Sequence, residues 1–109
     1  MKAAENETII SWFMPAAEHK KLKLSALDKN STMTDLLREY LKCGNKTYMD
    51  KKIDVTKYDL KNKSNYKQIL MTIDKVSHNT AKRIALNNDI TLKDLFVIYV
   101  CEGNNKNLI

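Results

Sequence analysis

The 109-residue sequence predicts a small, mainly α-helical fold in which two similar strand–helix–helix halves pack on each other. Composition is the first indication, since 43% of the residues are hydrophobic and 29% are charged, with one Pro and two Gly. Such a chain is too apolar for a disordered tail and too poor in turn formers for a many-stranded β protein. An internal repeat is the second indication, because a shift of 59 positions aligns residues 8–44 with residues 67–103 without gaps.

The repeat contains ten identical pairs, whereas composition alone would give about two or three. Both glycines and both histidines fall on this register, Gly44 with Gly103 and His19 with His78. A unit of 37 residues buries too little surface to fold alone, so the two halves must pack together. We therefore predict one folded unit with a first repeat at 8–44, a lysine-rich connector at 45–66 and a second repeat at 67–103.

The first half begins with residues 8–14, whose β-branched and aromatic side chains predict a strand that ends before Pro15. Proline suits the start of a helix, and residues 16–29 are good helix formers. Residues 32–35, Thr-Met-Thr-Asp, have the order of a capping box and predict the start of a second helix. Gly44 is expected to end that helix in the left-handed conformation.

The second half repeats this order. Residues 67–73 are the predicted strand, and Asp74 is a predicted cap for a helix over 75–87. Thr91 opens the last helix, which we expect to end at Gly103. The apolar run Phe-Val-Ile-Tyr-Val at 96–100 is typical of a buried strand when taken alone, but the repeat predicts a helix there, buried more deeply than its counterpart.

The connector at 45–66 has six Lys, three Asp and three Tyr, and it contains neither Gly nor Pro. Two interpretations stay open: a solvated connector with locally packed tyrosines, or a lysine arm that contacts phosphate. A short helix or strand around 49–60 is compatible with either.

Charge and apolar patterning limit the classes of function. The net charge of +6 and the pI of about 9.3 favour a polyanionic partner. The longest apolar stretch, 95–101, is far shorter than the roughly 20 residues of a membrane span, so we expect no membrane partner. The first residues lack the apolar core of a signal peptide, which predicts a cytoplasmic protein. Cys43 and Cys101 are predicted to be reduced, buried or half-buried thiols.

Motifs of catalysis and of cofactor binding are missing from the sequence. It contains no glycine-rich phosphate loop, no His-Glu-x-x-His and no nucleophile elbow. His19 and His78 each lack a second His or Cys one helical turn away, and no Cys-x-x-Cys occurs. We therefore predict a protein that is not an enzyme, with no catalytic residues, no cofactor and no metal site.

Two stretches carry a resemblance to a known family: Phe13-Met-Pro15 at the first strand–helix junction, and the segment from Asn30 to Leu41. Residues 89–96 are a weaker second copy of the latter. These segments resemble the ribbon-helix-helix (Arc/MetJ-type) family of DNA-binding proteins, in the tandem form of conjugative relaxosome accessory proteins. The resemblance implies a mainly α fold with a two-stranded antiparallel β-ribbon, here an intramolecular pseudo-dimer.

Alternation along the strands then assigns the two faces of the implied ribbon. Six large apolar side chains share the predicted inner face: Ile10, Trp12, Met14, Ile69, Met71 and Ile73. The opposite face supplies the predicted base readers: Ile9, Ser11, Phe13, Gln68, Leu70 and Thr72. The polar members suit hydrogen bonds to base edges in the major groove, and the apolar members suit thymine methyl groups. Packing against another protein is the alternative for this face.

The first turn of each second helix is the predicted phosphate site, because unpaired N–H groups lie there at the positive end of the helix dipole. The predicted phosphate contacts are Thr32, Met33, Thr34, Thr91, Leu92 and Lys93. A purely structural role, in which the threonines only cap their helices, is the alternative.

Together these features predict sequence-specific binding to double-stranded DNA through a β-ribbon in the major groove. The resemblance implies a plasmid relaxosome accessory protein at a transfer origin, with a relaxase and further copies of the chain on adjacent sites as candidate partners. The alternatives are a transcriptional repressor of a plasmid or phage operon and a protein-interaction module that does not bind DNA.

Overall fold

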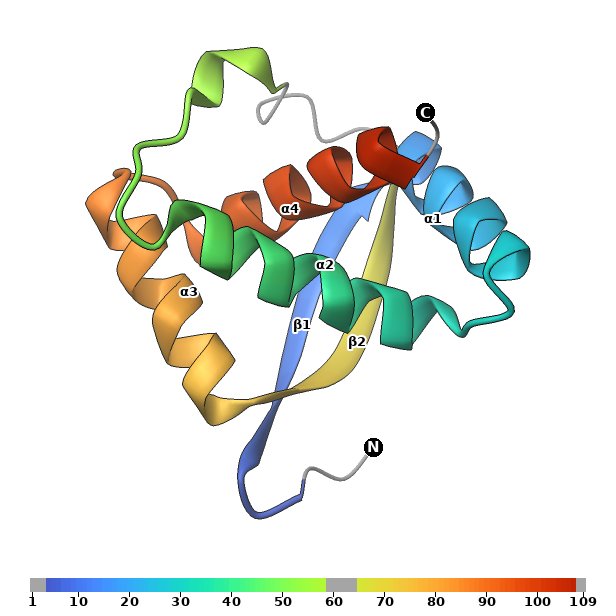
Figure 1. Cartoon of the computed structure of the whole chain (residues 1–109), viewed down its shortest axis with the longest axis horizontal. Helices are drawn as coiled ribbons and strands as arrows, with labels where there is room; N and C mark the ends of the chain where they lie inside the picture. The colour runs from blue at the N-terminus through green and yellow to red at the C-terminus, as the bar shows by residue number, and fades with distance from the viewer. Residues whose placement is uncertain (1–3, 59–64, 108–109) are drawn as a thin grey trace.

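A computed structural model describes residues 4–58 and 65–107. Its elements follow in the order β1 (Glu7–Pro15), α1 (Ala16–Asp28), α2 (Met33–Tyr48), the 3-10 helix η1 (Val55–Lys57), β2 (Tyr66–Asp74), α3 (Lys75–Asn87) and α4 (Leu92–Asn107) (Figure 1). Each boundary of β2, α3 and α4 lies 59 residues after the corresponding boundary of β1, α1 and α2. The predicted mainly helical fold with a two-stranded antiparallel sheet is confirmed.

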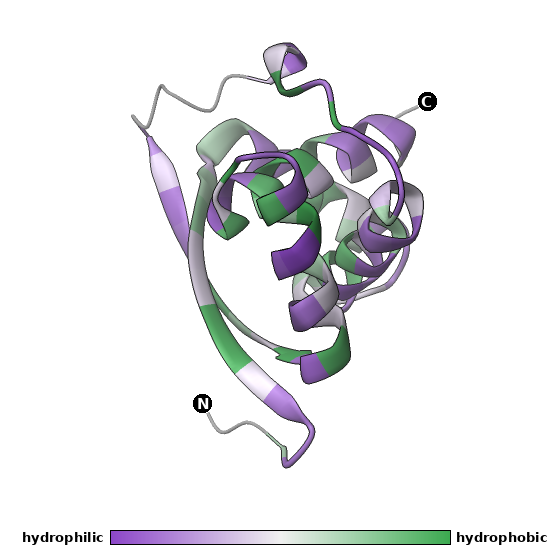
Figure 2. Cartoon of the chain, turned by 90° about the vertical axis from the view of Figure 1, so that its left-hand side faces the viewer, coloured by the Kyte–Doolittle hydropathy of each residue, from purple (hydrophilic) through white to green (hydrophobic). Residues whose placement is uncertain are grey.

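The two strands form a ribbon that lies on one side of the helices. They pair antiparallel from Glu7 opposite Asp74 to Pro15 opposite Tyr66, with Ser11 opposite Leu70 at the centre. Figure 2 shows the ribbon along one side of the molecule and all the helices on the other. Each strand is one residue longer at both ends than the sequence indicates. The helices therefore pack against one face of the ribbon only.

The inner face of the ribbon supplies part of the core. All six residues predicted to face inward are buried. Trp12 is fully buried, and its ring centroid lies 5.5 Å from that of Phe96, with the planes inclined at 52°. Every residue from 95 to 100 is also buried, so the apolar run lies in α4 and at the centre of the core, as predicted. Burial of this apolar surface stabilises the contact between ribbon and helices.

The starts of α2 and α4 have the caps that the sequence predicts. The Thr32 hydroxyl oxygen accepts a hydrogen bond of 3.1 Å from the Asp35 backbone N–H, and the Thr91 hydroxyl oxygen accepts one of the same length from the Asp94 N–H. Both bonds satisfy a donor that would otherwise lack a partner in the first helical turn.

The turns between the helices contain left-handed residues that are not glycines. Asn30 has a φ of 53° and Asp89 a φ of 56°. After α1, the N–H of Ser31 donates to the carbonyl of Ala26 at 2.9 Å and the N–H of Asn30 to that of Leu27 at 3.2 Å. This is a Schellman motif, and α3 ends in the same way before Asp89. Asn and Asp tolerate this conformation better than other non-glycine residues.

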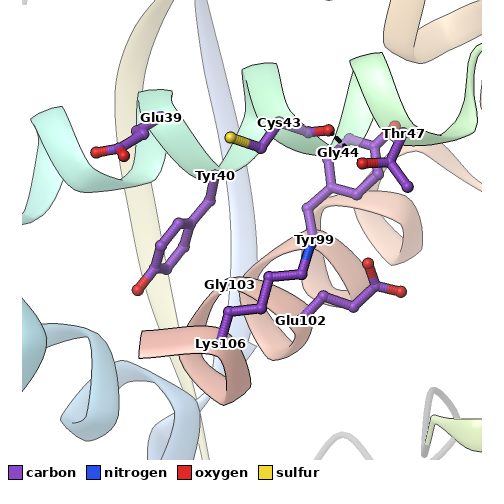
Figure 3. Close-up of a pocket in the computed structure, with 9 residues that line it drawn as sticks. All are labelled: Glu39, Tyr40, Cys43, Gly44, Thr47, Tyr99, Glu102, Gly103 and Lys106. Atoms are coloured by element: carbon purple, nitrogen blue, oxygen red, sulfur yellow. Dashed lines mark hydrogen bonds between the residues drawn. The ribbon is translucent and has the colours of Figure 1, made fainter. Parts of the chain in front are cut away.

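The predicted role of Gly44 and Gly103 as helix ends is wrong. Both glycines lie inside helices that continue to Tyr48 and Asn107, and neither has a positive φ. A Cβ on Gly44 would lie 2.4 Å from the ring of Tyr99, and one on Gly103 would lie 2.4 Å from the ring of Tyr40. Figure 3 shows this crossing of α2 and α4. The glycines are needed because each helix packs directly against a tyrosine ring of the other.

Two asparagines connect each of these helices to the opposite half. The side-chain amide of Asn45 in α2 donates to the carbonyl of Ser77 in α3, and that of Asn104 in α4 donates to the carbonyl of Glu18 in α1, both at 3.0 Å. The Tyr99 hydroxyl donates to the Asn45 side-chain oxygen, also at 3.0 Å. Both asparagines are buried, and they are 59 residues apart, so the matching of the halves continues beyond position 44.

The described part of the connector packs against the second half. Ile53 is buried, and its backbone N–H donates to the Asn88 side-chain oxygen at 2.8 Å. The hydroxyl groups of Tyr48 and Tyr58 both donate to the carboxylate of Glu102. The connector contains the short helix η1, and its remaining stretch, 59–64, lies outside the described residues.

Replacing Gly44 with Ala tests the close contact at the helix crossing. We expect the free energy of unfolding to fall by about 1–3 kcal/mol, because the added methyl group overlaps the Tyr99 ring. At an exposed helical position, a change from Gly to Ala would instead raise the free energy of unfolding by up to ~1 kcal/mol. Chemical denaturation measures the effect, with Cys43→Ala on the exposed side of the same helix as the control. A Gly44→Ala protein as stable as the wild type would contradict the contact.

The cap of α3 predicts a pH dependence of stability. The Asp74 carboxylate accepts the Ser77 N–H at 2.9 Å. Burial opposes the shift, but the hydrogen bonds from Ser77 outweigh it and hold the pKa of Asp74 below its ordinary value of 3.8. A carboxyl group with a lowered pKa in the folded state stabilises the protein above pH 3.8, and this contribution is lost as the pH falls through the folded-state value.

We therefore expect Asp74→Ala to lower the stability at pH 7 by about 1 kcal/mol. Asp74→Asn, which keeps a capping oxygen but does not titrate, should stay close to the wild type at pH 7 and lose less stability between pH 5 and pH 3. Urea denaturation across this range measures both effects. Equal acid sensitivity in Asp74→Asn and the wild type would show that the carboxylate does not contribute.

Candidate nucleic-acid interface

The outer face of the ribbon is exposed and carries five of the six predicted base readers. Ile9, Phe13 and Leu70 are 43%, 47% and 52% exposed, and Ser11 and Gln68 are also exposed. The Gln68 side-chain amide donates to the Ser11 hydroxyl oxygen at 3.1 Å across the ribbon. The centre of the face is thus a polar pair, and large apolar side chains surround it.

Thr72 differs from this pattern. Alternation places it with the outer residues, but it is only 8% exposed, so the expectation that all six share an open face is wrong at this position. The cause is Arg38 of α2, which extends to Thr72. Its Nε donates to the Thr72 carbonyl at 3.1 Å and its Nη2 to the Thr72 hydroxyl oxygen at 2.8 Å.

Arg38 is a site residue that the sequence did not indicate. Its Nη1 donates to the Asp35 carboxylate at 3.2 Å, so the guanidinium group joins the first turn of α2 to the ribbon. The position 59 residues later is Val97, so the repeat gives no signal for it. Strand alternation predicts the side of the ribbon on which Thr72 lies, but not the long side chain of another element that covers it.

The first turn of α4 flanks the other strand. A hollow of about 440 Å³ separates this turn from β1, and its lining includes Ile9, Ser11, Thr91 and Lys93. A second hollow of about 400 Å³ lies farther along β1, and its lining includes Phe13, Lys93 and Val97. The starts of α2 and α4 therefore lie beside the ribbon, α2 next to β2 and α4 next to β1.

The six predicted phosphate contacts belong to these two turns. Thr32 and Thr91 lie at the N-caps, where their hydroxyl oxygens already accept a backbone N–H, as the structural alternative requires. The next two residues of each helix, Met33 and Thr34 in α2 and Leu92 and Lys93 in α4, have backbone N–H groups with no acceptor within the helix. Lys93 is exposed and adds a positive charge beside β1.

One titratable group near this surface, His78, has a shifted pKa. Burial, followed by the charge of Lys82, lowers the pKa of His78 below its ordinary value of 6.5. His78 lines the hollow beside β1 and is therefore uncharged there at neutral pH. No group of three or more His, Cys, Asp or Glu that could hold a metal occurs among residues 4–58 and 65–107.

Both cysteines are free thiols, as predicted, but Cys43 is exposed and not buried. Burial, followed by the charge of Glu18, raises the pKa of the Cys101 thiol to about 12, so this group stays protonated at neutral pH. Cys43 lies on α2 at the helix crossing (Figure 3). It is therefore the more accessible of the two thiols for chemical labelling.

Comparison with known proteins gives no match: no family model fits the chain, and no curated protein or solved structure is significantly similar to it. Within the described ranges, every helix is too short or too polar to cross a membrane. A proposal of function therefore depends on the ribbon, its two flanks and the charge of the chain.

Proposed function

We propose that this chain is a sequence-specific double-stranded DNA-binding protein with a tandem ribbon-helix-helix fold. One observation carries the proposal: an antiparallel β-ribbon has an exposed outer face, and the N-terminus of a 16-residue helix lies beside each of its edges. The major groove of B-DNA admits a two-stranded ribbon, and helix N-termini bind phosphate. The net charge of +6 favours approach to DNA.

The outer face contains groups that suit base edges. Gln68 can form two hydrogen bonds with adenine, and the Ser11 hydroxyl can donate or accept. Ile9, Phe13 and Leu70 suit contact with thymine methyl groups. While Gln68 donates one N–H to Ser11, it keeps a second N–H and its side-chain carbonyl oxygen, and Ser11 keeps its hydroxyl hydrogen, so both side chains retain groups for base contacts. An A·T-rich target follows from this set of side chains.

The halves form an intramolecular pseudo-dimer in this proposal. In a dimer of identical chains, the outer faces of the two strands would match and would favour a palindromic site. Here Ser11 lies opposite Leu70, its repeat counterpart, so the two strands present different groups. One molecule therefore binds an asymmetric site, and several copies side by side cover direct repeats.

For the biological role, we propose a relaxosome accessory protein at a plasmid transfer origin, on the basis of the resemblance of the repeat segments to tandem ribbon-helix-helix proteins. Its partners would be DNA, further copies of itself and a relaxase, in the cytoplasm and without catalysis of its own. A transcriptional repressor of a plasmid or phage operon is the second role compatible with the same surface.

A protein-interaction module is the candidate from a different class, and one observation favours it. Three large apolar side chains, Ile9, Phe13 and Leu70, are each about half exposed on one face. Such a patch suits a partner strand or groove as well as DNA. Salt dependence separates the two, because binding to DNA releases counterions and binding through apolar contacts does not.

Duplex binding as a function of salt tests the proposal. We expect affinity for random-sequence duplexes to fall steeply as salt is raised, and Lys93→Ala to lower the slope of log K against log salt by about 1. Lys106→Ala removes the same charge about 20 Å farther along α4 and should leave the slope unchanged. Fluorescence anisotropy measures both. If the wild-type protein has no measurable affinity for duplex DNA at low salt, the proposal fails and the protein-interaction module stands.

Substitution of Gln68 tests base reading by the ribbon. After the preferred site has been selected from random duplexes, Gln68→Ala should lose roughly 5- to 150-fold discrimination at one base pair, the value of a good bidentate contact. Asn79→Ala, which removes an exposed amide from α3, is the matched control and should keep the wild-type preference. Unchanged preference in Gln68→Ala, with unchanged circular dichroism, would exclude reading by this residue.

A further inference from the structure

Arg38 is held in a fixed orientation at the edge of the ribbon. Its guanidinium group donates to three acceptors: the Thr72 carbonyl, the Thr72 hydroxyl and the Asp35 carboxylate. These bonds use the Nε–H, one N–H of Nη2 and one N–H of Nη1. Arginine has five N–H donors, so each terminal nitrogen keeps one N–H without a partner among the described residues. The side chain is 34% exposed.

The two remaining donors lie on the two terminal nitrogens, one on each. A fork of two N–H groups on the terminal nitrogens of arginine matches the O6 and N7 acceptors of guanine in the major groove. Three existing bonds limit the rotation of the guanidinium group, so little further conformational entropy is lost when the fork binds. Alternation places Thr72 on the outer face, but the guanidinium group covers it. At that end of the ribbon, the polar group available to DNA is therefore Arg38 and not Thr72.

The corresponding place in the other half has no arginine. The positions 59 residues away from Arg38 and Thr72 are occupied by Val97 and Phe13. Both line a hollow of about 400 Å³ beside β1, whose lining also includes Lys93 and Asp94, so the planar guanidinium fork of Arg38 has no counterpart at this place. One end of the ribbon thus presents an arginine, and the other presents a hollow with two apolar side chains in the places of Arg38 and Thr72.

We propose that Arg38 reads a guanine at one end of the DNA site and thereby fixes the direction in which the protein lies on the duplex. The Val97 end of the ribbon then faces the opposite end of the site, which has no guanine requirement at the symmetric position. This inference deepens the proposed DNA-binding function and rests on it.

Arg38→Lys is the decisive variant, because it keeps the positive charge and removes the bidentate fork. Using the full chain, sites are selected from random duplexes, and the affinity is measured for the selected site and for the same site with the guanine replaced by adenine. The wild type should prefer guanine, and Arg38→Lys should lose roughly 5- to 150-fold of this preference. Arg83→Lys, the same change at the other arginine of the chain, which is exposed on α3, should keep it.

Thr72→Val tests whether the fixed orientation of Arg38 is needed for the guanine preference. It keeps the shape of the side chain but removes the hydroxyl that orients Arg38, so the guanine preference should fall while the charge is unchanged. Direction is measured separately with an iron-chelate cleavage reagent on a cysteine introduced by Lys29→Cys, at the exposed turn before α2, in a Cys43→Ser background. Cleavage should occur on the guanine side of the site only.

The outcomes are distinct. The inference is overturned if Arg38→Lys keeps the same guanine preference as Arg83→Lys. It is also overturned if Arg38→Ala weakens binding equally for all sequences, because Arg38 would then contact phosphate and not a base. Equal cleavage on both sides of the site would overturn the fixed direction. Absence of any duplex binding by the wild type would instead remove the proposed function itself.

Discussion

The close crossing of α2 and α4 is the constraint on which the rest of the structure depends. Gly44 lies against the ring of Tyr99, and Gly103 lies against the ring of Tyr40, at distances that admit no Cβ. Because the two contacts are reciprocal, they fix both the separation and the relative direction of the helices. The starts of α2 and α4 are thereby held at opposite edges of the ribbon. The crossing therefore determines where these turns lie relative to a ligand bound on the ribbon.

The ribbon depends on the helices in turn. An isolated two-stranded hairpin is marginally stable at best in water, and these strands are not even adjacent in the sequence. Their inner face is stabilised by burial against the helices, as the packing of Trp12 on Phe96 illustrates. The outer face contributes nothing to this core, so its side chains are free to vary without loss of the fold. This division leaves exposed apolar residues such as Phe13 available for recognition.

The sequence predicted the elements well because most of their signals are local, and the repeat corrected the local signal at 96–100, which alone is typical of a strand. Strand alternation, the Thr32 and Thr91 caps and the repeat together identified every strand and helix. The roles of the glycines were not predictable, since a glycine that ends a helix and one that admits a neighbouring ring have the same signature in one sequence. The left-handed positions belong instead to Asn30 and Asp89. The cover over Thr72 was likewise not predictable, because it depends on a contact between residues 34 apart in sequence.

The comparison of the two halves shows where their shapes must agree and where they are free to differ. On the inner face of the ribbon, the three matched pairs of buried residues, Ile10 with Ile69, Trp12 with Met71 and Met14 with Ile73, are all apolar. On the outer face none of the three matched pairs is alike: Ile9 with Gln68, Ser11 with Leu70, and Phe13 with Thr72. Packing demands similarity because each half supplies the surface that buries the other. Recognition makes no such demand, so a surface built from two like halves can still be directional. A partner that contacts both strands at once would meet different chemistry at each end, and it would therefore bind in one direction.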